Sequence, residues 1–319
     1  MKVFIAGGTG FIGQALIKKL LVSGHAVTVL ARNPKKLDAL SPQLRTVSGS
    51  PLIPGPWQHE LVGHEVIINL TGASIFTRWT PKAKEMILHS RVAAARNIVE
   101  AIPPQADSPV TLINASASGY YGFCHDEEKY EVALPGRDFL ASVCKAWEDE
   151  ANLAQGKARV VLLRIGIVLG KNGGALAKML PGFRLGLAGK LGDGRQWFPW
   201  IHLDDLTSAI LFCTENRTIA GPVNLCAPNP ERNAEFTSIL GEVLHRPTFL
   251  AAPKFAIRLF LGELSAVVLE GCRMMPGVLM AKGFAFRFPK LQPALEDIVG
   301  KAEGNFFHLP HARVFRHRG

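Results

Sequence analysis

Short apolar runs alternate with amphipathic segments along most of the chain, up to about residue 227. The apolar runs are 2–6, 26–30, 45–48, 65–70, 111–115, 159–165 and 223–225, and segments with helical periodicity are 14–21, 81–102, 138–153 and the stretch that ends at Cys213. Continuous apolar runs are typical of strands buried on both faces, and helices between them are typical of parallel sheets. The pattern predicts an α/β fold built on a doubly wound parallel sheet of the Rossmann type.

A glycine-rich turn joins the first apolar run to the first helical segment. It can be read as Gly8-x-Gly10-x-x-Gly13 or as Gly7-x-x-Gly10-x-x-Gly13. Glycine permits a tight turn and lets the backbone approach a pyrophosphate, while the helix N-terminus offers free N–H groups and partial positive charge. The turn therefore predicts a dinucleotide site; a purely structural tight turn is the alternative.

The end of the second strand-like run indicates which cofactor is bound. An NAD-specific fold places a carboxylate there for the ribose 2′-hydroxyl, but this chain has Ala31 and Arg32, with Arg32 nineteen residues after Gly13. The guanidinium suits a 2′-phosphate, so we expect NADP(H); a solvated surface arginine is the alternative. Lys35 and Lys36 either add positive potential there or form an exposed helix start.

Two further features point to the same edge of the sheet. Small residues, Thr71 to Ala73, follow the fourth run and would let a ligand approach the backbone, although an ordinary strand-to-loop turn would look the same. Arg91 interrupts the apolar helix stripe that contains Ile87 and Ala94. A buried arginine needs an anionic partner, which is either a cofactor phosphate or a structural carboxylate.

The chain changes character after residue 168. Residues 170–200 are rich in glycine, basic and aromatic residues, which suits an anionic substrate beside the cofactor and equally suits plain packing. We predict a Rossmann domain from residues 1–168 and about 201–227, a smaller C-terminal substrate lobe from 169–200 and 228–300, and a basic tail, 301–319. Residues 249–269 are apolar but interrupted by charges, which favours an amphipathic or buried helix over a membrane span.

Composition narrows the functional class. The 319 residues are 48% hydrophobic, enough for a large core, and the net charge of +10 fits phosphate-bearing ligands as well as nucleic acid. No basic run has interleaved aromatics, so we expect no nucleic-acid partner. Five cysteines without Cys-x-x-Cys or zinc spacing predict reduced thiols and no metal. Because the chain begins with a core strand, we expect no signal peptide and a cytoplasmic protein without a membrane partner.

With these motifs in hand, the chain resembles the extended short-chain dehydrogenase/reductase superfamily over nearly its whole length. The matching motifs are GGTGFIG, NLTGA, a serine with YG after the fifth strand, the strand with Arg164, and IHLDDL. More narrowly, NLTGASI, FLASVCKAWE and GRQWFPWIHLDDL resemble the branch called epimerase family protein, which is sugar-nucleotide-epimerase-like and has a C-terminal domain of unknown function. The resemblance implies an NADP-binding protein whose cofactor contacts include Gly7, Thr9, Gly10, Phe11, Ile12, Gly13, Arg32, Leu70, Thr71, Gly72, Arg91, Ser116 and Arg164. For Arg164, a structural charge at the sheet edge is equally open.

The chain departs from the superfamily at the proton-transfer residues. Active members pair a Ser or Thr with Tyr-x-x-x-Lys, but the tyrosines here are Tyr120, Tyr121 and Tyr130, and none has a lysine four residues later. Ser116 matches the family serine best and Ser118 second. Tyr121 could donate a proton from the loop and Lys145 could reach a ribose; a packed tyrosine and a surface lysine are the alternatives.

Two functions follow from this departure. The first is an NADP(H)-dependent oxidoreductase or epimerase acting on a small anionic substrate, which includes nucleotide sugars. The second is a non-catalytic NADPH-binding protein that reports redox state to a partner. The sequence leaves homo-oligomerisation open.

Overall fold

A seven-stranded parallel sheet forms the centre of the molecule. The computed structural model describes residues 1–34, 37, 41–103 and 110–300. The strands follow the order β11-β7-β5-β4-β1-β2-β3, and they are β1 (Lys2–Ala6), β2 (Ala26–Ala31), β3 (Arg45–Ser48), β4 (Val66–Asn69), β5 (Val110–Ala117), β7 (Ala158–Ile165) and β11 (Gly221–Leu225). The order reverses between β1 and β4, as in doubly wound dinucleotide-binding sheets. The predicted fold class is confirmed.

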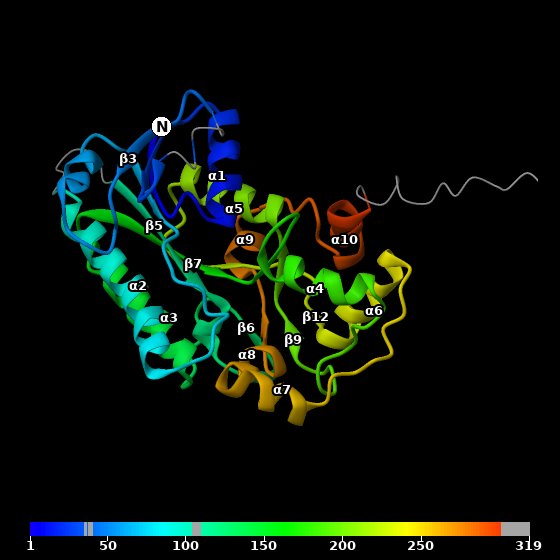
Figure 1. Cartoon of the computed structure of the whole chain (residues 1–319). Helices are drawn as coiled ribbons and strands as arrows, with labels where there is room; N and C mark the ends of the chain where they lie inside the picture. The colour runs from blue at the N-terminus through cyan, green and yellow to red at the C-terminus, as the bar shows by residue number, and fades with distance from the viewer. Residues whose placement is uncertain (35–36, 38–40, 104–109, 301–319) are drawn as a thin grey trace, which may run out of the picture.

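Helices cover both faces of this sheet (Figure 1). Helices α1 (Phe11–Val22) and α5 (Leu203–Glu215) pack together on one face, and α2 (Pro81–Ala101) and α3 (Phe139–Asn152) on the other. Thr80 caps α2 by accepting the Ala83 N–H, and Asp138 caps α3 by accepting the N–H groups of two residues. Two apolar cores result, one on each face of the sheet. The short helices η2 (Pro56–Leu61) and η3 (Ser118–Tyr121) follow β3 and β5.

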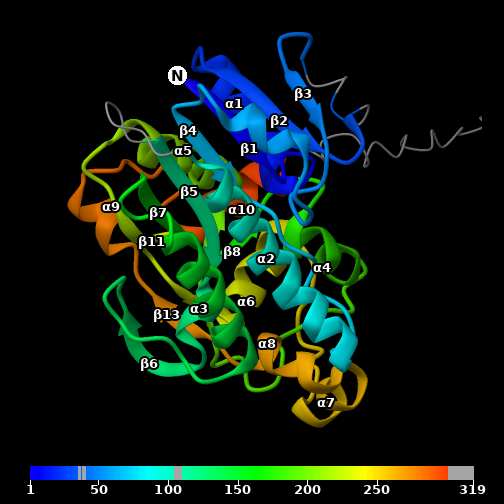
Figure 2. The ribbon, with the colours of Figure 1, turned by 90° about the vertical axis from the view of Figure 1, so that its left-hand side faces the viewer.

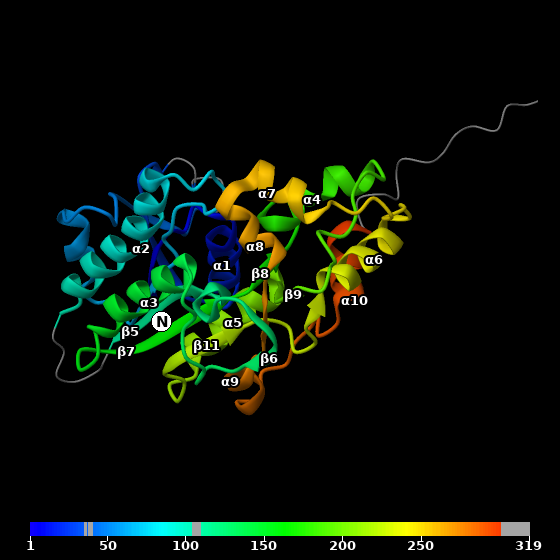
Figure 3. The ribbon, with the colours of Figure 1, turned by 90° about the horizontal axis from the view of Figure 1, so that it is seen from below.

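The second lobe contains helices α4 (Gly174–Arg184), α6 (Asn233–Leu244) and α10 (Leu291–Val299), which lie at the opposite end of the molecule from α2 and α3 (Figures 1 and 3). They share an apolar core that includes Leu176, Phe236 and Leu291. Shorter helices complete it: α7 (Lys254–Leu261), η4 (Gly262–Leu264), α8 (Ser265–Leu269) and α9 (Gly277–Ala281). The domain boundaries given above stay a prediction.

Three small two-stranded sheets lie outside the central sheet. They are β8 (Ile167–Leu169) with β10 (Trp200–His202), β9 (Trp197–Phe198) with β12 (Glu231–Arg232), and β6 (Cys124–Lys129) with β13 (Cys272–Met274). Figure 2 shows β6 and β13 side by side, so a strand that precedes α3 pairs with one from the C-terminal lobe.

Several elements differ from the sequence prediction. Helix α4 lies in a segment expected to be loop-rich, because the glycines before it and Pro181 within it hide its periodicity. Residues 249–269 form α7, η4 and α8 rather than one helix, since the chain turns at Gly262 with a φ of +57°. Lys35, Lys36 and the basic tail 301–319 lie outside the described residues.

Three further observations concern the cysteines, metal clusters and membrane-spanning helices. All five cysteines carry free thiols. Within the described ranges, no cluster of His, Cys, Asp and Glu has the arrangement of a metal site. In that same part of the chain, every helix is too short or too polar to span a bilayer.

Candidate functional site

The β1–α1 turn brings three segments of backbone into close contact. Gly7 has a φ of +86°, and a Cβ placed there would lie 2.7 Å from the carbonyl carbon of Leu70. A Cβ on Gly13 would lie 2.5 Å from the Gly7 oxygen. Real Cβ atoms do not approach so closely, so the turn needs glycine at both positions. The contact also places Leu70, the first residue after β4, directly beside the turn.

The N-terminus of α1 is open. Gly10 occupies the N-cap position without a side-chain cap, and the first turn of the helix contains no acidic residue. Thr9 and Gly10 are exposed. The free N–H groups and the positive end of the helix dipole therefore remain available to an anion. Phe11, the first residue of α1, turns its ring against Gly173 and Gly174, so the loop before α4 borders the same turn.

Arg32 lies just beyond the end of β2, next to β1 in the sheet. It is exposed and makes no hydrogen bond or ion pair with any residue that the structure describes. Its guanidinium is therefore free to bind a ligand at the end of β2 adjacent to the turn.

Arg91 lies against the loop that follows β4. Its guanidinium donates to the carbonyl oxygens of Ile87 and Ala73, at 2.8 and 3.1 Å, and a Cβ on Gly72 would lie 3.2 Å from its Cζ. The ring of Trp147 lies under it at 5.2 Å. Burial lowers the pKa of Arg91, and no described carboxylate pairs with it. This loop thus carries an uncompensated positive charge that a ligand anion could neutralise.

At the ends of β5 and β7, by contrast, the polar side chains are paired with one another. Ser116 and Arg164 lie opposite each other in the ladder, and both bind Glu148 of α3. The Ser116 hydroxyl donates to Glu148 Oε1 at 2.6 Å, while Arg164 Nε and Nη2 donate to the two Glu148 oxygens, each at 2.9 Å. All three residues are at most 4% exposed. The result is a buried bidentate ion pair that holds α3 against the sheet.

The same network continues to Tyr121 in η3. Arg164 Nη1 donates to Tyr121 Oη at 3.0 Å, and Tyr121 Oη donates to Asn224 Oδ1 of β11 at 2.6 Å. The Tyr120 ring lies 3.4 Å from Arg164 Cζ. Burial raises the pKa of Tyr121, so its phenol stays protonated at neutral pH. We call Ser116, Glu148, Arg164, Tyr121 and Asn224 the buried network.

Lys145 lies away from this network. Its ammonium donates to Asp149 at 2.6 Å on the outer side of α3, and its side chain is 56% exposed. Two residues of α3 that are four positions apart, as in Tyr-x-x-x-Lys, do face inward. They are Cys144 and Glu148, and both are buried. Burial raises the pKa of Cys144 to about 12, so it is a thiol rather than a nucleophilic thiolate at neutral pH.

The predicted site residues therefore form two groups, with Lys145 outside both. The turn residues Gly7 to Gly13, Leu70 to Gly72 and Arg91 lie together, with Arg32 beside them at the end of β2. Ser116, Tyr121 and Arg164 lie together in the buried network, where the geometry favours a structural charge for Arg164. Sequence reasoning did not single out Glu148 or Asn224. The buried face of α3, which places a glutamate among apolar residues, was the available signal for Glu148.

Comparisons with known proteins agree with this fold. The profile of the NAD dependent epimerase/dehydratase family matches residues 3–226, and that of a domain of unknown function matches residues 252–298. The chain is 40% identical to the chloroplastic homologue of epimerase family protein SDR39U1 from Arabidopsis thaliana, over 94% of this chain and 87% of the relative. It is 38% identical to an epimerase family protein of Staphylococcus aureus, over 93% of this chain and 98% of the relative.

Solved structures give the same result. The human epimerase family protein SDR39U1 (isoform 2), crystallised with NADPH, is 32% identical, with a TM-score of 0.83 over 94% of this chain and 99% of its own. UDP-glucuronic acid 4-epimerase from Bacillus cereus, in complex with UDP-glucuronic acid and NAD, is similar in fold, with 16% identity and a TM-score of 0.77 over 93% and 98% of the two chains. This chain belongs to the NAD dependent epimerase/dehydratase family.

Proposed function

We propose that the chain binds NADPH at the β1–α1 turn and acts as an NADP-dependent oxidoreductase or epimerase on a small anionic substrate. The β1–α1 turn is the observation that carries the proposal. Gly7 and Gly13 leave a cradle that any Cβ would fill, and the uncapped N–H groups of α1 face an open turn. These features fit a pyrophosphate, which needs backbone donors at short range and positive potential.

The preference for NADP rests on Arg32. Its free guanidinium stands where an NAD-specific protein has a carboxylate, and it can bind a 2′-phosphate through two parallel hydrogen bonds. The human relative that was crystallised with NADPH supports the same preference.

The other residues of this part of the site would orient the cofactor and the substrate. The backbone of Thr71 and Gly72 lies beside the turn, and Arg91 would supply positive charge to a phosphate or an anionic substrate. On the second lobe, Arg232 and Arg273 lie near the Trp197 ring, at 4.4 and 5.0 Å, but they pair with Asp126 and Glu128, so their charges are already compensated. NADPH, when bound, supplies a hydride from its nicotinamide ring.

A second candidate function is favoured by the buried network. The Ser116 hydroxyl and the Tyr121 phenol both donate to protein acceptors, so neither proton is directed to a substrate. This arrangement suits a protein that binds NADPH without turning it over, because both hydroxyl groups are already engaged within the protein. In that case the chain would report the redox state to a partner.

A pair of fluorescence titrations tests the cofactor proposal. NADPH and NADH are titrated separately into purified protein from which any bound nucleotide has been removed. We expect NADPH to bind more tightly, and Arg32→Ala to remove about one to two decades of NADPH affinity while NADH changes little. Arg217→Ala, at another exposed arginine, is the matched control. Equal affinities for the two nucleotides in the wild type would refute the assignment of Arg32.

Turnover separates the two candidate functions. Protein that binds NADPH is assayed for NADPH oxidation with a carbonyl panel and, by NMR, for epimerisation of nucleotide sugars, because an epimerase regenerates its cofactor. Turnover by the wild type on either panel would establish the enzyme, and Ser116→Ala then shows whether the buried hydroxyl contributes to it. Tight NADPH binding without activity on either panel supports the non-catalytic protein.

A further inference from the structure

The segment between β4 and α2 makes a contact that joins the two faces of the central sheet. Residues 71–79, which we call the strap, begin beside the β1–α1 turn and lead into α2 on one face. Near the middle of the strap, the centre of the Phe76 ring lies 4.5 Å from Lys178 Nζ of α4. Helix α4 follows the glycines that pack on Phe11, the first residue of α1 on the other face. The contact therefore spans the carboxyl edge of the sheet.

These contacts form a closed circuit around the N-terminus of α1. On one side, the turn lies beside Leu70, the residue before the strap; on the other, Phe11 packs on Gly173, just before α4. The circuit is completed where Phe76 meets Lys178. The N–H groups that suit a pyrophosphate lie inside it. A dinucleotide bound at the turn would pass through this circuit, so a contact of the circuit must open for the dinucleotide to enter or leave.

Both ends of the strap are fixed to the helices behind it. At its start, the Ala73 carbonyl oxygen accepts from Arg91 Nη2 of α2 at 3.1 Å. At its end, the Trp79 ring packs edge-on against Phe139 of α3, with 5.1 Å between the ring centroids. Because Phe76 lies between these two anchors, the strap holds its ring in a defined position toward α4.

The contacts between this region and the second lobe are weak. Phe76 is 45% exposed, and Lys178 is exposed and makes no hydrogen bond or ion pair within the described part of the chain. A second contact, the ion pair of Lys84 with Glu263 of η4, also lies at the surface. Exposed cation–π contacts and exposed ion pairs contribute little to stability, so thermal motion breaks them readily.

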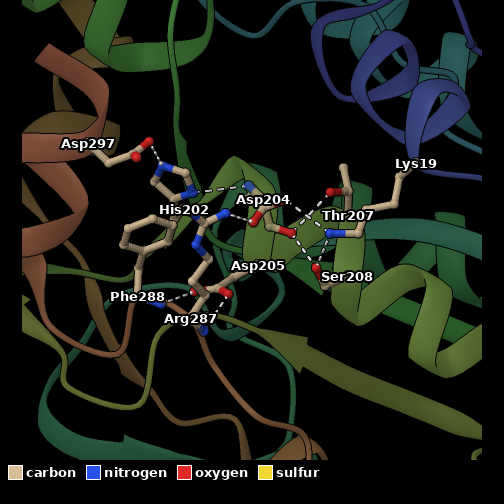
Figure 4. Close-up of polar contacts among 9 residues, drawn as sticks. All are labelled: Lys19, His202, Asp204, Asp205, Thr207, Ser208, Arg287, Phe288 and Asp297. Atoms are coloured by element: carbon tan, nitrogen blue, oxygen red, sulfur yellow. Dashed lines mark hydrogen bonds and ion pairs between the residues drawn. The ribbon is translucent and has the colours of Figure 1, made fainter. Parts of the chain in front are cut away.

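The second lobe is held more firmly at α5 (Figure 4). Asp204 accepts from Arg287 Nη1 at 3.0 Å, and Asp205 accepts the backbone N–H groups of Arg287 and Phe288, each at 2.8 Å. Asp205 and Phe288 are buried. Since these residues lead into α10, the second lobe is fixed at α5, and the contact with the strap is the one that opens more easily.

We propose that the strap closes over bound NADPH and that the contact of Phe76 with Lys178 is its latch, which opens to admit and release the cofactor. This inference rests on the proposed function, because it takes the β1–α1 turn as the NADPH site. Binding and release both pass through the open form, so weakening the latch raises both rates by the same factor and leaves the affinity unchanged. A residue that contacts the cofactor would change the affinity instead.

Stopped-flow fluorescence with NADPH measures both rates. Phe76→Ala removes the ring of the latch, and Lys178→Met removes its charge but keeps an apolar side chain. We expect each variant to raise the association and dissociation rate constants by about two- to fivefold, while the equilibrium dissociation constant changes by less than about twofold. Phe260→Ala, at a phenylalanine of α7 that is 83% exposed, and Lys157→Met, at an exposed lysine beyond α3, are the matched controls and should behave as the wild type.

The possible results separate the latch from the cofactor site. If Phe76→Ala and Lys178→Met bind and release NADPH at the rates of their controls, the latch is refuted and the cofactor site stands. A dissociation rate that rises alone, with a matching loss of affinity, would show that the two side chains contact NADPH directly, and would also overturn the latch. A wild type that binds no NADPH would refute the cofactor site, and the latch with it. Because the two variants alter the same contact from opposite sides, each checks the other.

Discussion

The two halves of the predicted cofactor site use their polar groups in opposite ways. At the β1–α1 turn, the N–H groups of α1 lack a side-chain cap, and Arg32 has no partner among the described residues. In the buried network, the guanidinium of Arg164 is shared among Glu148, Tyr121 and a backbone carbonyl. The turn is therefore suited to receive an anion, whereas the network is complete without a ligand.

This difference shows that position in a fold does not by itself assign chemistry. Both regions lie at the carboxyl ends of parallel strands, where ligands collect in sheets of this type. Yet Ser116 and Arg164 stabilise the contact between α3 and the sheet. Burial opposes the charge of Arg164, but the hydrogen bonds and charge of Glu148 outweigh it, so the pKa of Arg164 is raised. The partners of each side chain, rather than its strand, indicate its role.

The largest expected effect is on the buried network. Glu148→Gln keeps the shape of the side chain but removes its charge, which leaves Arg164 buried beside a neutral amide. Breaking a buried ion pair in this way costs about 3–5 kcal/mol of unfolding free energy. Urea denaturation measures the loss, and Asp149→Asn, on the exposed face of α3, is the control that should leave the midpoint unchanged. A loss below about 1 kcal/mol would mean that the network is not closed in solution.

The next effect concerns the turn. Gly13→Ala places a Cβ 2.5 Å from the Gly7 oxygen and 2.6 Å from the Gly8 Cα, so α1 must move away from the turn. We expect a cost of about 1–3 kcal/mol in stability, and a fall of about tenfold to a hundredfold in NADPH affinity because the N–H groups are displaced. Fluorescence titration and thermal denaturation measure the two effects.

A matched glycine provides the control for Gly13. Gly182 lies inside α4, and the nearest atom to an added Cβ there is 3.6 Å away. Gly182→Ala should therefore leave NADPH affinity unchanged and raise stability slightly, since alanine favours helix. If Gly13→Ala bound NADPH as well as Gly182→Ala does, the turn would not be the cofactor cradle.

The sheet could be predicted from the sequence to a large extent. All seven of its strands follow the short apolar runs, because strands buried on both faces need continuous apolar residues. The strands β6 and β13 were missed, since β6 reads CHDEEK and its pairing depends on a segment far away in the sequence. Helix α4 was missed because glycine and proline obscure its pattern.

The site could be predicted only in part, for a physical reason. The turn requires glycine for steric reasons, so its residue types reveal it directly. The role of Arg164 depends on Glu148, which lies on another element, and no local pattern pairs them. Lys145 follows Cys144 by one residue, which rotates it about 100° around α3 and away from the sheet. Only the tertiary contacts therefore distinguish the residues of the ligand site from those with a structural role.

Tyr121→Phe tests whether the hydrogen bonds of the buried network are formed in solution, because the substitution removes only the hydroxyl. The variant loses the bond to Asn224 and the one from Arg164, so we expect about 1–2 kcal/mol less stability. Since burial raises the pKa of Tyr121 above its ordinary value, the contribution of the hydroxyl is complete below about pH 10 and is lost only as the pH rises through the folded pKa. Urea titrations at several pH values should give a constant difference between about pH 6 and 9. A difference that shrinks within that range would show that a tyrosinate forms.

The smallest expected effect is at Lys145. This lysine lies on the helix where other members of the superfamily have Tyr-x-x-x-Lys, but no tyrosine precedes it by four residues. The Lys145 ammonium already bonds to Asp149 on the exposed face of α3. Exposed pairs of this kind contribute little, so Lys145→Ala should leave both the denaturation midpoint and the NADPH affinity unchanged. A lysine that held the cofactor ribose would instead lose affinity on substitution while stability stayed the same. That result would require α3 to turn by about one residue when NADPH binds, and would replace the closed network with an active site that assembles around the cofactor.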